Sequence, residues 1–350
     1  MNRRASFTTI KASLLLLALL GLITGSSCLP KSPSESGGTV NITVYGFSIM
    51  KESLEKAIYP GFVAKVKTEH GLDVRFTSSF AGSETITNQI IAGVKAQVAI
   101  LSIERDAQRL RDHQDVTSDW HLLPQKGILN KTPFVILVRK GNPKGIHDFA
   151  DLGKPGVRLI HPDPISSGGA MWSILAIYGS ELVKSEKQSG EADRARALQT
   201  LQTVWRNVIS TPGSAREART QFESGYGDSL ITYELDALLM KQGNPNVDAE
   251  VVIPEATILS EHPAVVIDRN VSATDRPFIN AFMQYLWSEE AQRAFVKYHF
   301  RSSTSEALTQ ENKELATIKY PFTVDYFGGW DKAYPEIIES IFRDSAQKRK

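Results

Sequence analysis

The chain has 350 residues, of which 41% are hydrophobic, 23% charged and 9% aromatic, a composition typical of a globular protein. This composition excludes collagen-like, disordered and disulfide-scaffold proteins. The 40 basic and 39 acidic residues give a net charge of +1; without the three basic residues of the N-terminal segment, 37 basic residues face 39 acidic ones, a net charge of −2. We expect no nucleic-acid partner, because binding to a phosphate backbone requires a basic excess.

The N-terminal segment carries the signals of export. Basic residues precede the apolar run 14–23, and small residues follow it. This pattern predicts a secretory signal peptide at residues 1–27, because the run is shorter than the roughly 20 apolar residues that span a bilayer. Cys28, the single cysteine of the chain, stands where cleavage would leave an N-terminal cysteine for lipid attachment, and residues 28–38 read as a Ser-, Pro- and Gly-rich tether. We expect a periplasmic or cell-surface protein anchored to the membrane by lipid; an ordinary signal peptide with an incidental cysteine is the alternative.

From residue 39 onward, strand-like runs alternate with helical patterns, which indicates βαβ units and parallel sheets. Strands are predicted at 40–45, 74–78, 97–101, 132–139, 156–160, 229–232 and 264–267. Helices are predicted at 50–67, with an interruption near Pro60, and at 83–94, 170–182, 191–207, 214–224 and 233–242, before a helical C-terminal third. About 320 residues of alternating elements exceed what one core usually accommodates. The sequence therefore predicts an α/β protein of two lobes.

The motifs of common enzymes and metal sites are missing from the sequence. It contains no His-Glu-x-x-His, no Gly-x-Ser-x-Gly and no phosphate-binding loop. His113 and His121 stand eight residues apart, too far for one helical turn, so we expect no metal and no cofactor. The best case for a secreted hydrolase is Ser167 with His161 and Asp163, but residues so close in one loop rarely reach catalytic geometry.

One arrangement recurs three times: a strand, a turn of glycines and hydroxyl residues, and a helix start. It occurs at residues 76–83, 160–169 and 210–215. A helix N-terminus exposes unpaired N–H groups and about half a positive charge, and glycine lets a ligand approach the backbone. Three such turns that converge would bind an anion. The alternative is that these serines and glycines only cap helices.

These turns and the strand at 134–144 resemble the sulfate-binding proteins of bacterial sulfate/thiosulfate ABC importers. The most specific match is the run FVILVRKGNPK at 134–144, followed by KPGV at 154–157 and SSGGA at 166–170. The resemblance covers residues 39–330, nearly all of the chain after the tether. Its match ends in the run FGGW at 327–330.

This resemblance implies a two-lobed periplasmic binding protein of type II, with two crossover connections and a ligand cleft between lobes that close like a trap. We expect one lobe at residues 39–131 plus 262–350 and the other at 132–261. The implied function is capture of sulfate or thiosulfate by a monomer and delivery to the permease of an ABC transporter. Molybdate, tungstate and phosphate remain open as alternative oxyanions, and no enzymatic step is implied.

The resemblance also implies which residues hold the anion through neutral donors. Ser83 would donate a hydroxyl from one lobe. Ser167, Gly168 and Gly169 would form a run of donors at the start of a long helix of the other lobe, and Ala215 would donate a backbone N–H at a third helix start. A side chain at Gly169 is expected to stand between the helix N-terminus and the ligand.

Two positions depart from the family pattern. The loop at 46–49, which contributes Ser48 to the expected site, lacks the usual acidic residue, and this argues against phosphate, whose proton needs an acceptor. Tyr233 stands in place of a tryptophan, and a phenol both donates and accepts hydrogen bonds. Arg216, directly after Ala215, is the rival candidate for a charged anion contact; its alternative partner is a neighbouring carboxylate, which the resemblance favours.

Overall fold

The computed structural model describes residues 39–347 of the chain. The expected signal peptide, Cys28 and the tether lie outside these residues. Within residues 39–347, no helix combines the length and the apolar character that a membrane span requires.

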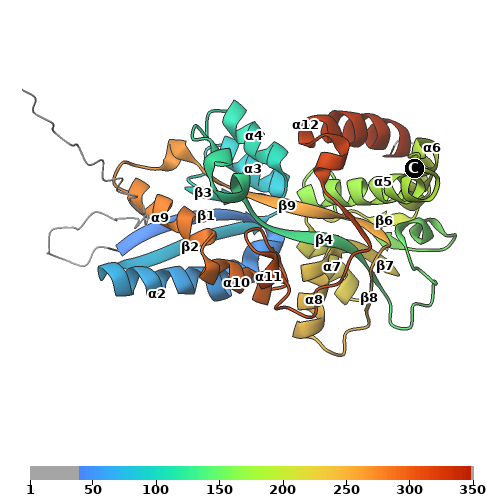
Figure 1. The fold of residues 1–350 in the computed structure, drawn as a ribbon, viewed down its shortest axis with the longest axis horizontal. Coiled ribbons are helices and arrows are strands. Elements are labelled where there is room, and N and C mark those ends of the chain that lie inside the picture. The colour runs from blue at the N-terminus through green and yellow to red at the C-terminus, as the bar shows by residue number, and fades with distance from the viewer. Residues whose placement is uncertain (1–38, 348–350) are drawn as a thin grey trace, which may run out of the picture.

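The described chain forms two α/β lobes that lie side by side and share two long strands, β4 and β9 (Figure 1). The strands are β1 (Thr39–Phe47), β2 (Asp73–Ala81), β3 (Val98–Ile100), β4 (Ile128–Val138), β5 (Leu159–Ile160), β6 (Val208–Ser210), β7 (Ser229–Tyr233), β8 (Glu250–Val252), β9 (Ala256–Val266), β10 (Arg301–Ser302) and β11 (Tyr320–Phe322). The α-helices are α1 (Lys51–Ser53), α2 (Tyr59–His70), α3 (Ser83–Ile91), α4 (Glu104–Asp112), α5 (Gly168–Ser189), α6 (Arg194–Arg206), α7 (Ala215–Glu223), α8 (Glu234–Gly243), α9 (Arg276–Leu286), α10 (Glu289–Lys297), α11 (Glu306–Thr309) and α12 (Trp330–Ala333). Short 3₁₀ or π segments are η1 (Ser48–Met50), η2 (Leu54–Ile58), η3 (Trp120–Leu122), η4 (Pro124–Gly127), η5 (Phe149–Gly153), η6 (Asp268–Asn270), η7 (Val324–Phe327) and η8 (Tyr334–Ala346).

The two lobes repeat one strand order. In the first lobe the order is β2-β1-β3-β9-β4, and in the second it is β6-β5-β7-β4-β8. In each lobe the first strand is parallel to its two neighbours, and the strand that returns from the other lobe is antiparallel. Strand β4 changes partner at Pro133: residues up to Pro133 pair with β9, and residues from Phe134 pair with β7. The two-lobed fold with two crossover strands is confirmed.

Most predicted elements are present, with two informative differences. The helix that begins at η1 keeps helical dihedral angles through Ile58 and Tyr59, so Pro60 is accommodated by the π segment η2 and not by a break. A π turn tolerates the missing N–H of proline because it already rearranges the backbone hydrogen bonds. Helix α4 and the first half of β9 were not predicted. Helix α4 gives a weak signal because it is polar at most positions and buries only one narrow face.

The C-terminal segment corrects the expected division of the lobes. We expected all of residues 262–350 in the first lobe, but η8 packs against α5 and α6 of the second (Figure 1). The rings of Phe342 and Trp205 lie 4.6 Å apart, and those of Trp330 and Trp172 lie 4.7 Å apart. An amphipathic pattern predicts that a helix is buried, but it does not say which surface covers it.

The topology directs helix N-termini toward the space between the lobes. In the first lobe η1, α3 and α4 begin after the parallel strands β1, β2 and β3; in the second, α5, α7 and α8 begin after β5, β6 and β7. The carboxyl ends of the two sets of parallel strands face each other. Open parallel sheets bind ligands at this edge.

Candidate anion-binding site between the lobes

Glycines bring the two lobes into contact across the cleft. A Cβ atom on Gly82 of the first lobe would lie 2.2 Å from the carbonyl oxygen of Ser166 and 2.6 Å from that of Gly213, both in the second lobe. A Cβ on Gly168 would lie 2.8 Å from the Cβ of Ser102. Real Cβ atoms do not approach other atoms so closely, so these glycines are required where the lobes close.

Ser102, at the end of β3, connects both lobes through three hydrogen bonds. Its N–H donates to Ser83 Oγ over 2.9 Å, its carbonyl accepts from Trp172 Nε1 over 2.7 Å, and its hydroxyl lies 2.9 Å from the hydroxyl of Tyr233. The side chain is fully buried. Reasoning from sequence missed Ser102, although its position between a strand end and α4 repeats the signal that selected Ser83.

Tyr233 lies against the N-terminus of α5. A Cβ on Gly169 would lie 2.8 Å from the Tyr233 hydroxyl, so a side chain there would displace the phenol ring directly. Burial raises the pKa of the Tyr233 phenol, which is therefore neutral at physiological pH. Gly169 was expected to be needed because a side chain would block the ligand. In the structure, a side chain at Gly169 would instead collide with Tyr233.

Several neutral donors along this contact have no acceptor within residues 39–347. The N–H groups of Gly168, Gly169 and Ala215 are the first of α5 and α7, and helix geometry gives such groups no partner. Ser167, the N-cap residue of α5, is buried and its hydroxyl makes no capping hydrogen bond, and Ser48, the first residue of η1, is also buried. Since η1 contacts α7 between the lobes, the structure brings all of these expected residues to one interface.

Ser83 belongs to the same interface but is already engaged. Its Oγ accepts from the Ser102 N–H and lies 2.5 Å from Oδ2 of Asp106, a fully buried carboxyl on α4. The sequence signalled no acid at this place, because Asp106 lies in the helix that was not predicted. The expected role of Ser83 as a free hydroxyl donor therefore depends on Asp106.

Arg216 is paired with carboxylates and makes a bridge between the lobes. Its two terminal nitrogens bind the two carboxylate oxygens of Glu52 on α1, the second at 2.6 Å, and Asp236 lies 3.6 Å from its Nε. Burial alone would raise the pKa of Glu52, but the hydrogen bond and the charge of Arg216 outweigh burial and lower that pKa. The neighbouring-carboxylate alternative for Arg216 is what the structure contains.

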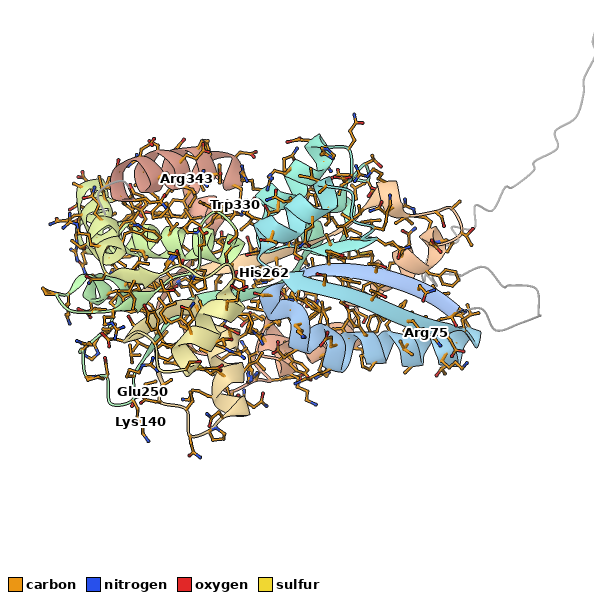
Figure 2. The ribbon with its side chains drawn as sticks, turned by 180° about the vertical axis from the view of Figure 1, so that it is seen from behind. Arg75, Lys140, Glu250, His262, Trp330 and Arg343 are labelled. Carbon is orange, nitrogen blue, oxygen red and sulfur yellow. The ribbon has the colours of Figure 1, made fainter. Side chains whose placement is uncertain are left out.

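A buried histidine forms the floor of the site, midway between the lobes (Figure 2). His262 on β9 binds Asn130 of β4 through Nδ1 over 2.7 Å and faces Ser260 through Nε2 over 3.0 Å. Its ring centre lies 4.7 Å from that of Phe47 and 5.8 Å from that of Tyr233. Burial lowers the pKa of His262 to about 3, so the imidazole is neutral. This ring joins both crossover strands to residues of the site.

His161 and Asp163, two residues of the hydrolase alternative, have structural partners in the turn before α5. Nε2 of His161, the nitrogen that would serve as base, lies 2.6 Å from Ser173 Oγ, and Nδ1 lies 2.7 Å from the Pro162 carbonyl oxygen. The Asp163 carboxylate accepts the backbone N–H of Ile165. These residues stabilise the turn before α5.

Comparison with known proteins agrees with this geometry. A family model described as bacterial extracellular solute-binding protein matches residues 42–301. The sulfate-binding protein of Synechococcus elongatus is 33% identical over 91% of this chain and 91% of its own length, and the sulfate-binding protein of Escherichia coli is 34% identical over 79% and 83%. The solved structure of the sulfate-binding protein SubI from Mycobacterium tuberculosis covers 85% of this chain and 99% of its own, with a TM-score of 0.76 and 28% identity. The chain therefore belongs to the bacterial extracellular solute-binding proteins and has their two-lobed periplasmic binding fold.

Proposed function

We propose that the chain binds sulfate or thiosulfate between its lobes, outside the cytoplasmic membrane, and delivers the anion to the permease of an ABC transporter. The observation that carries this proposal is the set of unpaired neutral donors at helix starts, with Gly168 and Gly169 on α5 and Ala215 on α7. Relatives named for sulfate binding support the choice of anion.

The basic residues near these helix starts are already paired with carboxylates, which supports binding of the anion by helix dipoles and not by ion pairs. Arg216 is bound to Glu52, and Arg105 and Arg109 are bound to Glu84. Cations that are already paired add little attraction for a ligand, whereas the N-terminus of a helix attracts an anion through aligned N–H groups. A tetrahedral anion with acceptor oxygens on all sides suits donors that come from both lobes.

The number of donors is sufficient for useful affinity. Around six charge-assisted hydrogen bonds at about 1.5 to 3 kcal/mol each contribute about 9 to 18 kcal/mol. Desolvation of the anion, its lost motion and the closure of the lobes oppose this by several kcal/mol. A net of about 8 kcal/mol lies within the range that remains and corresponds to a dissociation constant in the micromolar range.

Titration calorimetry tests the proposal on the chain from Cys28 onward. Sulfate or thiosulfate should bind at micromolar concentration, and molybdate, tungstate and phosphate should compete poorly. Gly168→Ala is the diagnostic variant, because its Cβ would meet Ser102, and it should bind at least tenfold more weakly while unfolding cooperatively. If a competitor binds more tightly than both sulfur oxyanions, the proposed substrate is wrong; if no oxyanion binds, the proposed function is wrong.

Closure on the ligand belongs to the same proposal. We assign the part built on β1, β2 and β3 to one lobe and the part built on β5, β6 and β7, together with η8, to the other, with β4 and β9 as the connections. Ligand contacts from both lobes favour the closed state, as a population shift requires. X-ray scattering should give a smaller radius of gyration with sulfate than without it. An unchanged radius at saturating sulfate would contradict closure of the lobes on the ligand.

The lipid anchor is proposed from the sequence. We infer that Cys28 is the first residue of the mature chain and carries lipid, since two or three acyl chains give firm anchoring where one is marginal. Cys28→Ser should move the protein from the membrane fraction to the soluble fraction of cells that express it. An unchanged distribution would contradict the anchor without affecting anion binding, and light scattering of the purified protein checks the expected monomer.

A further inference from the structure

Three groups compete for the hydroxyl of Ser83. A serine hydroxyl has one proton to donate and two lone pairs that accept. One lone pair takes the N–H of Ser102 over 2.9 Å. The proton and the other lone pair remain for Asp106 Oδ2, at 2.5 Å, and for an anion in the proposed site. The protonation state of Asp106 decides whether the Ser83 proton points to Asp106 or to the anion.

An ionised Asp106 would turn Ser83 away from a sulfate. Its oxygens only accept, so the Ser83 proton would point to Asp106 and a lone pair would face the anion. A neutral Asp106 reverses the bond: its O–H donates to Ser83 Oγ, and the Ser83 proton is free for the anion. Since sulfate oxygens are all acceptors, only the second arrangement makes Ser83 a donor.

The surroundings of Asp106 favour the neutral acid. The side chain is fully buried, and its Oδ1 has no hydrogen-bond partner among the described residues. Glu84 on α3 takes the hydrogen bonds of Arg105 and Arg109, which leaves Arg109 Nη1 3.8 Å from Asp106 Oδ1. Burial, and after it the charge of Glu84, raises the pKa of Asp106 well above its usual range.

Among the described residues, the other elements that contact α4 form no ion pair with Asp106: His121 of η3 binds Glu104, and Tyr334 of η8 lies against Arg105. Strand β9 contributes Val265 to the apolar cluster that contains Ala107, and the charged residues of α12, Asp331 and Lys332, are exposed to solvent. A dianion on the far side of Ser83 adds a second like charge and disfavours ionisation of Asp106 further. Binding of the anion and protonation of Asp106 therefore support each other.

We propose that Asp106 is the positioning residue of the anion site: as a neutral acid it donates to Ser83 Oγ, turns the Ser83 proton toward a fully ionised oxyanion and couples sulfate binding to the uptake of one proton from solvent. The proposal rests on the proposed function. The only bond that forms is the O–H bond of Asp106, and the solvent or buffer gives up the proton as the site closes.

The test counts protons by calorimetry with sulfate from pH 5 to pH 9, in pairs of buffers that differ in ionisation enthalpy. As the pH rises and Asp106 of the free protein ionises, the wild type should take up an increasing number of protons, approaching one per sulfate bound. Above the pH at which Asp106 of the free protein ionises, the affinity for sulfate should fall by up to tenfold per pH unit. Asp106→Asn keeps an N–H donor for Ser83 but cannot titrate. It should bind without proton uptake and with affinity independent of pH.

Asp115→Asn is the matched control, because Asp115 is also fully buried in the first lobe but is bonded to Arg269 and His113, at the other end of α4. It should keep the wild-type proton count. Sulfate binding without proton uptake by the wild type would overturn this proposal alone, and this measurement needs no variant to fold. Equal uptake by Asp106→Asn and the wild type would also overturn it, whereas absence of any sulfate binding would overturn the proposed function.

Discussion

The bridge between Glu52 and Arg216 should hold the closed lobes together. Glu52 lies on α1 of the first lobe and Arg216 on α7 of the second, so the pair forms only when the lobes meet. The substitution Glu52→Gln removes the charge and keeps the shape of the side chain. Arg216 would retain Asp236, 3.6 Å from its Nε, so the change leaves no unpaired buried cation.

The exposure of the pair sets the magnitude. The side chain of Glu52 is 19% exposed and that of Arg216 is 23% exposed, so the pair is neither fully exposed nor fully buried. An exposed ion pair contributes about 0.2–1 kcal/mol, and rupture of a buried pair costs about 3–5 kcal/mol. With two parallel hydrogen bonds and a remaining partner for the arginine, we expect a loss of about 1–2 kcal/mol of closure. This corresponds to a dissociation constant raised about 5- to 30-fold.

Calorimetry with sulfate measures the loss, and thermal unfolding of the ligand-free protein should show no change, since open lobes hold the two residues apart. Glu55→Gln, which alters an exposed carboxylate on the adjacent η2 segment, should bind like the wild type. Because closure lowers the pKa of Glu52, its contribution is complete above the ordinary value of 4.5 and is lost as the pH falls through the lowered pKa. An unchanged dissociation constant for Glu52→Gln would refute the reasoning.

Three further variants test the closed site and its floor. Gly82→Ala should weaken binding about 5- to 150-fold, because the new Cβ would clash with the backbone of the other lobe. The melting temperature of the free protein should stay unchanged, because Gly82 has φ of −60° and ψ of 145°, which alanine also adopts. Wild-type affinity of this variant would show that the lobes do not close this far. Tyr233→Phe removes the bond to Ser102 and should raise the dissociation constant about fivefold in the same assay, and no change would mean that the phenol is not used. His262, whose pKa is lowered to about 3, stabilises the fold fully above its ordinary pKa of 6.5 and progressively less as the pH falls toward 3, by up to about 1.4 kcal/mol per unit. Urea unfolding at pH 7 and pH 5 should therefore show a smaller difference for His262→Gln than for the wild type or for the exposed-site control His121→Gln, and equal differences would contradict the assignment.

Local sequence patterns were enough to predict the alternation of strands and helices and the turns that carry glycine and serine. Residues 134–138 are apolar at each position because this part of β4 is covered on both faces, and such a run is recognisable without a partner. Gly82 and residues 166–169 stand where the chain leaves a strand, starts a helix and allows a close approach to its backbone. These demands act on neighbouring residues, so neighbouring residues reveal them.

The tertiary structure alone decided which of these elements meet. Glu52 and Arg216 are 164 positions apart, and nothing local marks either as the partner of the other. Ser102 becomes part of the site only because the end of β3 faces Tyr233 of the other lobe. Asp106 lies in a polar helix whose burial comes from its neighbours, so the acid behind Ser83 could not be read from the chain. Contacts between distant segments depend on how the lobes pack, and packing is a property of the whole fold.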